Sequence, residues 1–359
     1  MLCGGYTVNV CEKTQSRDIF YGQVIAGMRR MVALLLAALM AAAVLAACAP
    51  TPAPVPLAQA PPQQVLPIAQ LSAQQAPMPV TQSAAASAAA FAIPMPVASG
   101  VNVSRNNNGE IDFSNASDGY VMARFTRQTA ASVRVIIVGP NGAQYQYFLN
   151  TNGRWEVFPL SVGNGQYTIS IFEQISGNRF AQVNSVTINV TMPDPLAPFL
   201  RPNQFVNFNQ DSRAVTLAGE LTRGSTSTLD RVSRIYNWVI RNISYDFDLA
   251  RNVRSGFVPN IDQTIERGRG ICFCYSSVMT AMLRSQGIPT RLVIGYAGTV
   301  YHAWISVWTP ESGWINNVIW FDGRTWRLMD PTFAATGNQS PEVMQFIGTG
   351  ANYRPMFFH

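Results

Sequence analysis

The sequence predicts an α+β protein, in which an all-β part precedes a part where helices pack on an antiparallel sheet. Three observations lead to this prediction. Apolar and polar residues alternate in short runs from about residue 100 to 191. Two helical patterns and then a series of strands fill residues 229 to 329. The segment Met192–Pro195 lies between the two parts, and its two prolines interrupt either pattern.

Length and charge narrow the class of protein. The chain has 359 residues, of which 48% are hydrophobic and 12% charged. This length favours two domains plus unstructured segments, and the low charge favours a protein outside the cytoplasm. The net charge is +6, and two of these units lie before Cys48, which leaves about +4 after it. Because there is no basic run or basic helix face, the sequence argues against nucleic-acid binding.

The cysteines give no disulfide framework. They are Cys3, Cys11, Cys48, Cys272 and Cys274, and the last two are too close for an unstrained bridge. Two cysteines and one internal histidine make a poor zinc site, so we expect no structural metal and no cofactor.

A targeting segment is predicted over residues 28–48. Two arginines precede an apolar run, Val32–Ala47, which is short for a membrane span and typical of a signal peptide. It ends in Leu45-Ala46-Ala47-Cys48, which resembles a bacterial lipobox and implies cleavage before Cys48 and lipidation of that residue. The alternatives are an ordinary secretory signal or a single membrane anchor. Residues 1–27 are then a mis-assigned upstream extension.

Residues 49–99 are rich in Pro, Ala, Gln and Ser and carry no charge. This composition buries no core and predicts a disordered, semi-rigid spacer between the membrane and the folded parts.

Residues 100–192 predict an antiparallel β-sandwich of the immunoglobulin-like kind. Period-two strands are expected at Tyr120–Phe125, Ser132–Val138, Gln144–Leu149, Trp155–Pro159, Gln166–Glu173 and Ser185–Val190. The turn Gly139–Gly142 joins two of them. Because this part has no His or Cys, we expect either a scaffold for the next domain or a spacer and wall-binding module.

Residues 193–347 carry the mixed part, followed by a tail at 348–359 that either packs on the sheet or frays. The patterns predict helices at Leu229–Arg241 and Cys272–Gln286, with a loop between them. Strands are expected at Thr290–Tyr296, His302–Thr309, Gly313–Phe321 and Thr325–Met329, with a turn at Asp322-Gly323 between the last two.

This order can bring together a cysteine, a histidine and a carboxylate. Cys272 begins a helix, where unpaired backbone N–H groups and the helix dipole stabilise a thiolate and can also hold an oxyanion. His302 begins one predicted strand, and Asp330 ends another, where its carboxylate can orient the imidazole. His302 and His359 are the two histidines of the chain. Taken alone, His302 fits a half-buried strand histidine equally well.

Several motifs resemble the bacterial transglutaminase-like (papain-fold) superfamily, in the family's order over about 110 residues. They are Ile235–Val239 and Ile243–Asp246, GICFCYS at Gly270–Ser276, LRSQGIPTR at Leu283–Arg291, His302–Trp304, and Asp330–Thr332. The resemblance implies a papain-like core in which Cys272 is the nucleophile, His302 the base and acid, and Asp330 the orienting residue.

Three assignments stay open within this resemblance. Cys274 stands where the family often has Asp; we choose Cys272 as nucleophile because Cys274 lies about 200° further around the helix. Cys274 is then a small buried residue or a redox partner. Tyr245 either assists the oxyanion or packs. The tryptophans of the strands either line a cleft or fill the core.

A cysteine of low pKa paired with a histidine attacks amides and forms a thioester. The sequence therefore predicts a cell-surface cysteine acyltransferase or peptidase, anchored through Cys48, that acts on amide bonds of protein or cell-wall peptide. The same three residues serve transamidation and hydrolysis. The alternatives are a non-catalytic surface binding or assembly module that retains the fold, and a wall-binding adhesin with a vestigial enzyme. The intact Cys, His and Asp argue against both.

Overall fold

The computed structural model describes residues 91–316, 319–321, 326–328 and 353–359. These residues belong to one compact unit, Ala85–His359. The predicted signal with Cys48, the spacer and Asp330 lie outside the described residues. None of the helices in the described part has the length and apolar character needed to cross a membrane.

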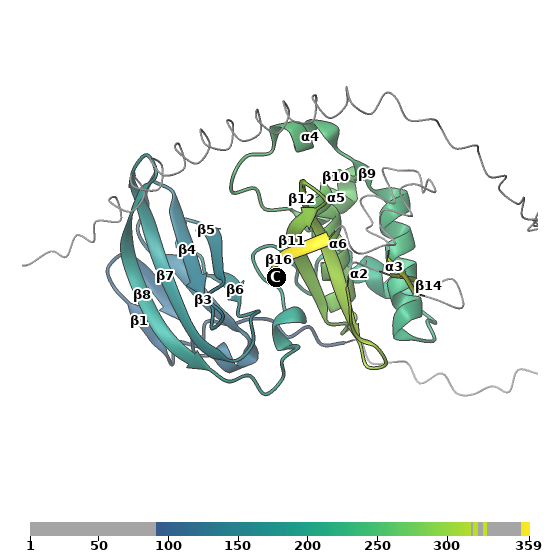
Figure 1. The fold of residues 1–359 in the computed structure, drawn as a ribbon, viewed down its shortest axis with the longest axis horizontal. Coiled ribbons are helices and arrows are strands. Elements are labelled where there is room, and N and C mark those ends of the chain that lie inside the picture. The colour runs from purple at the N-terminus through teal and green to yellow at the C-terminus, as the bar shows by residue number, and fades with distance from the viewer. Residues whose placement is uncertain (1–90, 317–318, 322–325, 329–352) are drawn as a thin grey trace, which may run out of the picture. The chain divides into compact units, whose positions relative to one another are not determined.

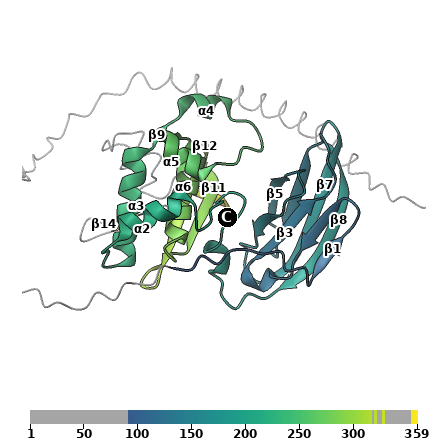
Figure 2. The ribbon, with the colours of Figure 1, turned by 180° about the vertical axis from the view of Figure 1, so that it is seen from behind.

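The N-terminal β-region consists of two four-stranded antiparallel sheets (Figures 1 and 2). The first has the order β1-β2-β3-β6 and the second β5-β4-β7-β8. The strand bounds are β1 Val103–Arg105, β2 Gly109–Asp112, β3 Tyr120–Phe125, β4 Val133–Val138, β5 Gln144–Leu149, β6 Glu156–Pro159, β7 Gly165–Ser176 and β8 Arg179–Val190. Six of these match predicted strands within a few residues, whereas the short β1 and β2 were not predicted.

One apolar cluster joins the two sheets. In β4, Val133, Val135 and Ile137 are buried and alternate with half-buried residues, as the period-two pattern requires. They belong to the same cluster as Ile111 and Val121 of the first sheet. The buried faces of both sheets therefore form one core.

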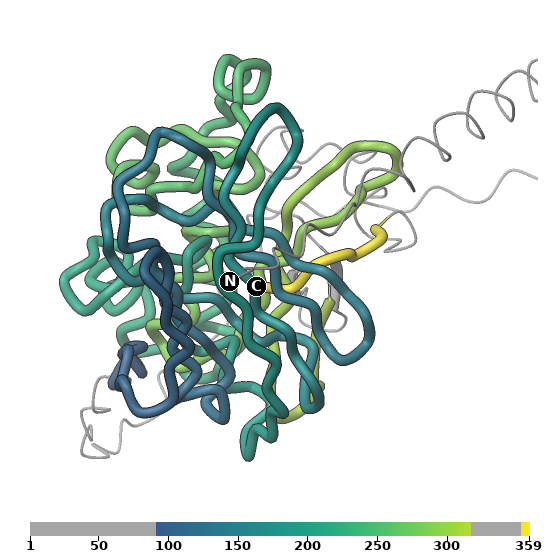
Figure 3. The backbone as a smooth tube through the Cα atoms, turned by 90° about the vertical axis from the view of Figure 1, so that its left-hand side faces the viewer, coloured from purple at the N-terminus to yellow at the C-terminus, as the bar shows by residue number. Residues whose placement is uncertain are grey.

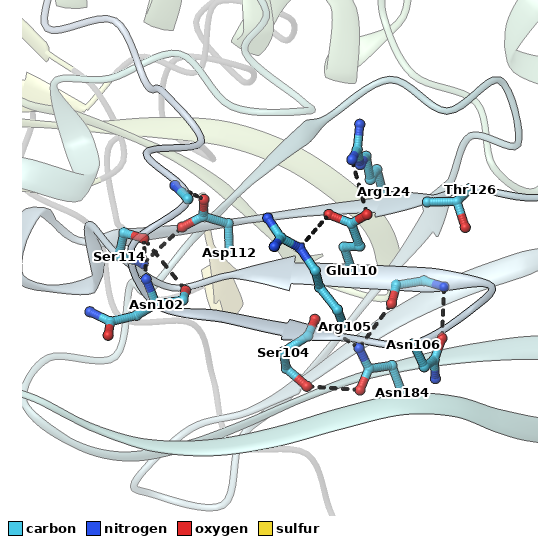
Figure 4. A network of polar contacts seen from close by, with 12 residues as sticks. Asn102, Ser104, Arg105, Asn106, Glu110, Asp112, Ser114, Arg124, Thr126 and Asn184 are labelled. Atoms are coloured by element: carbon cyan, nitrogen blue, oxygen red, sulfur yellow. Dashed lines mark hydrogen bonds and ion pairs between the residues drawn. The ribbon is translucent and has the colours of Figure 1, made fainter.

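A polar network closes one edge of this region (Figure 4). The Asn184 side chain, from β8 of the second sheet, accepts a hydrogen bond from Ser104 Oγ at 2.9 Å and donates to the Gly109 carbonyl at 3.0 Å, both in the first sheet. Glu110 lies between Arg105 and Arg124, with N–O distances of 3.2 and 2.9 Å. The Asn184 side chain bonds to strands of both sheets, so we assign this network to joining the sheets.

The mixed core follows the short 3-10 helix at Ala197–Phe199. Its helices are α2 Arg213–Thr222, α3 Thr228–Asn242, α4 Phe247–Asn252, α5 Ile261–Arg267 and α6 Cys272–Arg284. Ser227 caps α3 by accepting a hydrogen bond from the Asp230 N–H at 3.1 Å. The structure corrects the expected loop before Ile261, because Asp246 caps the short helix α4 within it.

Helices α2, α3 and α6 lie on one side of the core sheet (Figures 1 and 2). This sheet is antiparallel, with the order β13-β12-β11-β16. A separate hairpin pairs β14 with β15. The bounds are β11 Thr290–Ala297, β12 Val300–Thr309, β13 Gly313–Ile315, β14 Ile319–Phe321, β15 Trp326–Leu328 and β16 Tyr353–Phe358. The predicted strand Gly313–Phe321 is thus two strands in different sheets.

The segment expected as a tail supplies the edge strand β16. Its pairing with β11 shifts in register between Ile294 and Gly295. A Cβ added at Gly295 would lie 2.2 Å from the Arg354 carbonyl oxygen and 2.8 Å from the Trp304 ring. A glycine is therefore required where β16 crosses β11.

Arg284 and His359 meet in the interior at the end of α6. The C-terminus lies near the middle of the view in Figure 3, where other segments of the chain surround it. The Arg284 guanidinium is fully buried and donates to the carbonyl oxygens of Thr290, Arg201 and His359 at 2.6–3.0 Å. The ring of His359 lies against β5, where Tyr147 Oη and His359 Nδ1 are 3.0 Å apart. These contacts fix the end of α6, and with it the direction in which the helix presents its first turn.

We predict that His359 makes stability sensitive to acid. Burial, and next the nearby Arg284 charge, lower the pKa of the His359 imidazole from 6.5 to about 3. Between these values the unfolded chain takes up a proton that the folded chain cannot, so stability falls as pH falls from 6.5 towards 3. Each pH unit costs up to about 1.4 kcal/mol.

Chemical denaturation of the wild type and of His359→Gln, measured from pH 4 to 8, checks this expectation. The difference in unfolding free energy between the two proteins should be constant above pH 7 and should shift in favour of the variant below pH 6. A difference that is independent of pH would show that His359 is protonated in the folded state as readily as in the unfolded state.

Candidate active site

Cys272 is the first residue of α6. Ile271 precedes it in an extended conformation and accepts hydrogen bonds from the Cys274 and Tyr275 N–H groups at 2.8 and 3.1 Å. The N–H groups of a first helical turn have no acceptor inside the helix, and the dipole places positive charge there. The Cys272 side chain is half-buried, so it combines a helix N-terminus with access from solvent. Both conditions favour a reactive thiolate.

A two-residue parallel pairing holds the chain ahead of Cys272. Strand β9, Ser244–Tyr245, pairs with β10, Arg269–Gly270, in the register Tyr245 to Gly270. The Asp246 N–H donates to the Gly270 carbonyl at 2.9 Å and extends this contact. Tyr245 is thereby brought opposite a residue two positions before the cysteine.

Gly270 is required by the close approach of Cys274. A Cβ added at Gly270 would lie 2.5 Å from the Cys274 Cβ and 3.2 Å from Thr264 Cγ2. The strand can therefore run against the first turn of α6 only with a glycine at this position.

Cys274 faces the interior, away from solvent. It is 3% exposed, and burial raises the pKa of its thiol, while the Ile271 backbone and the Thr264 side chain, by hydrogen bonding, oppose that rise in part. A buried thiol with a raised pKa is a poor nucleophile. This position agrees with the prediction that Cys274 is a small buried residue.

We therefore expect selective alkylation in the native protein. At pH 8, iodoacetamide should modify Cys272 at least about tenfold faster than Cys274, because the second thiol is buried and protonated. Peptide mapping by mass spectrometry gives both rates, and the same protein in denaturant provides the control in which the rates converge. Faster modification of Cys274 than of Cys272 in the folded state would show that Cys272 is not the reactive thiol.

His302 reaches this end of the core through the β11–β12 hairpin. The tight turn at Gly287, with φ of 70°, sends β11 back along α6, so the end of β11 returns towards the first turn of the helix. His302 is the third residue of β12, not its first, and pairs with Gly295. It is 6% exposed, and its ring lies near Trp304 and Tyr353, with centroids 6.2 and 6.5 Å away.

Tyr301 precedes His302 on β12, and this strand packs on α6. Partial burial raises the pKa of the Tyr301 phenol, with further contributions from Tyr296 and from Cys272. The structure therefore places Tyr245 beside the start of α6 and His302 on a strand that packs on the same helix, whereas Asp330 lies outside the described residues.

Sequence reasoning missed several residues of this site. Thr264 and Gly270 shape the space around the two cysteines, and Tyr353 reaches the histidine from β16. Gly270 stands two positions before the predicted nucleophile, within the motif Gly270–Ser276, but its packing against Cys274 was not predicted. Tyr353 comes from a distant part of the chain, which no local pattern reveals.

Two of the strand tryptophans, Trp304 and Trp314, take the packing role. Trp304 is 1% exposed and belongs to a small apolar cluster with Val293 and Tyr353. Trp314 lies under the Arg291 guanidinium at 3.7 Å, which also faces the rings of Phe199 and Phe358. Both therefore pack within the protein.

The described residues have two other features that bear on ligand binding. In that part of the chain, no three His, Cys, Asp or Glu side chains gather as metal ligands would. A cavity of about 370 Å³ lies between residues 207–212 and 258–262. It is lined by polar side chains that include Asn207, Asn209 and Asp262, and it does not include Cys272.

Comparison with known proteins agrees with this geometry. Residues 215–331 match the model of the transglutaminase-like superfamily, and the helices packed on an antiparallel sheet in this region fit the expected α+β core. For these residues the predicted relationship to the superfamily is confirmed.

Individual relatives cover short stretches. An uncharacterized protein, YebA, of Bacillus subtilis is 30% identical over 123 residues, which are 29% of this chain and 17% of that protein. A protein-glutamine gamma-glutamyltransferase of Pseudomonas aeruginosa is 36% identical over 61 residues, or 13% of this chain and 9% of that protein. The red sea bream transglutaminase structure has 11% identity and a TM-score of 0.28, covering 65% of this chain and 54% of that chain. A likeness at this TM-score adds nothing to the family assignment.

Proposed function

We propose that this protein is a cysteine acyltransferase or amidase in which Cys272 is the nucleophile, His302 the general base and acid, and Asp330 the residue that orients the imidazole. One observation carries the proposal. Cys272 is the half-buried first residue of α6, the helix on which the strand that carries His302 packs. The family match of residues 215–331 supports a cysteine-dependent enzyme.

The reaction follows from these positions. The Cys272 thiolate attacks the carbonyl carbon of an amide, and the resulting oxyanion accepts hydrogen bonds from N–H groups of the first turn of α6. His302 gives the proton it took from the thiol to the leaving nitrogen, and the C–N bond breaks. The acyl group then remains on sulfur as a thioester. An amine or water, deprotonated by His302, attacks the thioester and releases the thiol.

Tyr245 has two roles open to it in this scheme. Its pairing opposite Gly270 places it near the oxyanion position, and its ring packs against Phe247 with centroids 5.0 Å apart. A Tyr245→Phe substitution separates the roles, since packing survives the loss of the hydroxyl and hydrogen bonding does not.

We further propose that the enzyme acts at a bacterial surface, on protein or cell-wall peptide. The support is the signal-like segment ending at Cys48, whose lipidation would anchor the chain, and the uncharged spacer that follows it. The two sheets with their common core support an immunoglobulin-like sandwich that acts as a scaffold for the catalytic domain.

The lysine content of the sequence bears on which amines could accept the acyl group. Lys13 is the only lysine of the chain and precedes the proposed cleavage site. A mature chain starting at Cys48 would therefore have no lysine through which it could cross-link to itself, although this usage also fits a simple bias of genome composition.

The test is to incubate the soluble protein with a blocked glutamine peptide and a biotinylated alkylamine. Mass spectrometry separates the outcomes, because transamidation adds the amine with loss of ammonia and hydrolysis converts the amide to an acid. We expect one of these products with the wild type and neither with Cys272→Ala. Equal product from both proteins would remove Cys272 from the reaction.

A further inference from the structure

The cavity of about 370 Å³ between residues 207–212 and 258–262 takes no part in the chemistry proposed for Cys272. Its walls are the segment before α2 and the start of α5, and its lining includes Asn207, Asn209, Asn260 and Asp262. Ligand sites in proteins commonly have volumes of about 300–1,000 Å³ and a few polar groups that converge on the ligand. The cavity therefore has the size of a site for a small molecule or for one unit of a polymer.

Two of its asparagines are held in place by the backbone near them. Asn209 Oδ1 accepts a hydrogen bond from the Asp211 N–H at 2.9 Å, and Asn260 Oδ1 accepts one from the Gln263 N–H at 3.0 Å. In the described part of the chain, the NH2 groups of these two side chains have no acceptor. Because their oxygens are already used, both side chains offer hydrogen-bond donors to a ligand.

The carboxylate of Asp262 is also half used. Its Oδ1 accepts a hydrogen bond from the Ala214 N–H, in the first turn of α2, at 3.2 Å, which fixes the side chain and leaves Oδ2 for a ligand. The Asn207 side chain makes no hydrogen bond with the described residues. The cavity thus offers three amide NH2 groups as donors and one carboxylate oxygen as an acceptor.

This set of groups selects a class of ligand. None of the described residues that line the cavity is basic, so an anion would meet a carboxylate without a compensating positive charge. A divalent cation usually needs several carboxylates, whereas Asp262 is the one in the lining. Val258 and Pro259 add a small apolar surface. A neutral ligand with hydroxyl donors, a larger number of acceptors and a small apolar group fits best.

Ring contacts place the cavity in the neighbourhood of the nucleophile. Phe273 follows Cys272, and its ring meets those of Phe205 and Phe257 edge-on, with centroids 5.1 and 6.4 Å apart. The two walls of the cavity begin two residues after Phe205 and one residue after Phe257. Two residues of chain span at most about 7 Å. A ligand in the cavity is therefore within reach of a substrate that extends from the attacked amide.

We propose that this cavity is a binding site for a neutral acetamido sugar. A sugar hydroxyl donates to Asp262 Oδ2, and the acetamido carbonyl and ring oxygens accept from the asparagine NH2 groups. The acetamido methyl group packs on Val258 and Pro259. An unsubstituted sugar lacks both this carbonyl and this methyl group, so it leaves donors of the cavity unsatisfied. The inference goes beyond the proposed function, because binding of the sugar does not require Cys272.

The experiment is a titration of the purified full-length chain with N,N′-diacetylchitobiose, a neutral disaccharide with two acetamido groups. Cellobiose, which has hydroxyl groups in place of both acetamido groups, is the comparison. Calorimetry gives the dissociation constants, and saturation-transfer NMR shows which sugar protons contact the protein. We expect the acetamido sugar to bind at least about fivefold more tightly, with the strongest saturation at its methyl groups.

Two variants locate the site in the cavity. Asp262→Asn keeps an oxygen for the Ala214 N–H and removes the charge, so it should weaken binding by about fivefold or more. Asn207→Ala removes a side chain that has no hydrogen bond within the described residues, so the protein should fold normally and bind about threefold more weakly.

Asn141→Ala is the matched control. Asn141 lies in the turn between β4 and β5, and its Oδ1 accepts a hydrogen bond from the Ala143 N–H at 3.0 Å, as Asn209 Oδ1 does from a residue two positions on. Because Asn141 does not line the cavity, this variant should bind the sugar with the wild-type dissociation constant.

The outcomes separate this site from the proposed function. Absence of binding at millimolar sugar, equal binding of the two disaccharides, or binding that survives both cavity variants would each overturn the site. The Cys272→Ala chain should bind the sugar as the wild type does. Loss of the sugar site with amide turnover intact would leave the proposed function standing, and sugar binding without any amide turnover would leave the site standing alone.

Discussion

Replacing Cys272 or His302 by alanine is expected to reduce amide turnover by at least about a thousandfold. The first change removes the sulfur that carries the acyl group, and the second removes the group that shuttles the proton. Because the two residues act as one unit, the double variant should be no worse than either single variant. Initial rates of amine incorporation or hydrolysis, measured with the glutamine peptide, give the three values.

The chain offers matched controls for both substitutions. Cys274→Ser changes the neighbouring buried cysteine, and His359→Gln changes the other histidine, which lies in the interior against Tyr147. Both controls should retain turnover within a fewfold of wild type, with thermal unfolding used to confirm that each variant is folded at the assay temperature. Loss of activity in Cys274→Ser with retention in Cys272→Ala would reverse the assignment of the nucleophile.

Gly270→Ala is expected to be the most damaging conservative change near the site. The new methyl group would stand 2.5 Å from the Cys274 Cβ and 3.2 Å from its sulfur, so either β10 or the first turn of α6 must move. Overpacking of this kind costs about 1–3 kcal/mol of unfolding free energy. Displacement of Cys272 by about 1 Å can lower the rate by a further factor of roughly a hundred.

Gly219→Ala provides the comparison for this change. Gly219 lies within α2, and no heavy atom stands within 4 Å of its added Cβ. Alanine there should stabilise the protein by about 0.5–1 kcal/mol and leave turnover unchanged. Denaturant unfolding and initial rates measured on both variants test the pair. A Gly270→Ala protein as stable and as active as the Gly219 variant would show that the strand and helix are not in contact as described.

The parts of the fold that sequence predicted are those with strong local signals. Tyr120–Phe125 and Gln144–Leu149 were predicted with the bounds the structure has, because the first is a short apolar run and the second alternates polar and aromatic residues. Helix α3 was found from the helical period of its apolar residues. The start of α6 at Cys272 was found from the residues around it.

The parts that were missed depend on distant contacts. Helices α4 and α5 have six and seven residues, which is too short for a periodic pattern, and each is held by a side-chain cap at Asp246 or Asn260. Strand β16 pairs with β11 across a long separation in the chain, and the sequence of Tyr353–Phe358 contains a proline that argues against a strand. The proline is tolerated because β16 is an edge strand, and one side of an edge strand has no hydrogen-bonded neighbour.

The candidate site shows the same division. The motif residues Cys272 and His302 were predicted from their neighbours in the sequence. The groups that shape their surroundings, such as Thr264 beside Cys274 and Tyr353 beside His302, are brought in by the packing of α5 and β16. Asp330 stays a prediction, because it lies outside the described residues.

The most direct test of the central claim is the rate of alkylation of Cys272 as a function of pH. The measurement uses Cys274→Ser protein, so that one thiol reports, and repeats it with His302→Ala added. We expect Cys272 at pH 7 to react at least about threefold faster than a free thiol, and the rate to fall towards that of a free thiol when His302 is removed. A rate like that of a free thiol in both proteins would contradict a working thiolate–imidazolium pair and would favour a binding module that retains the fold.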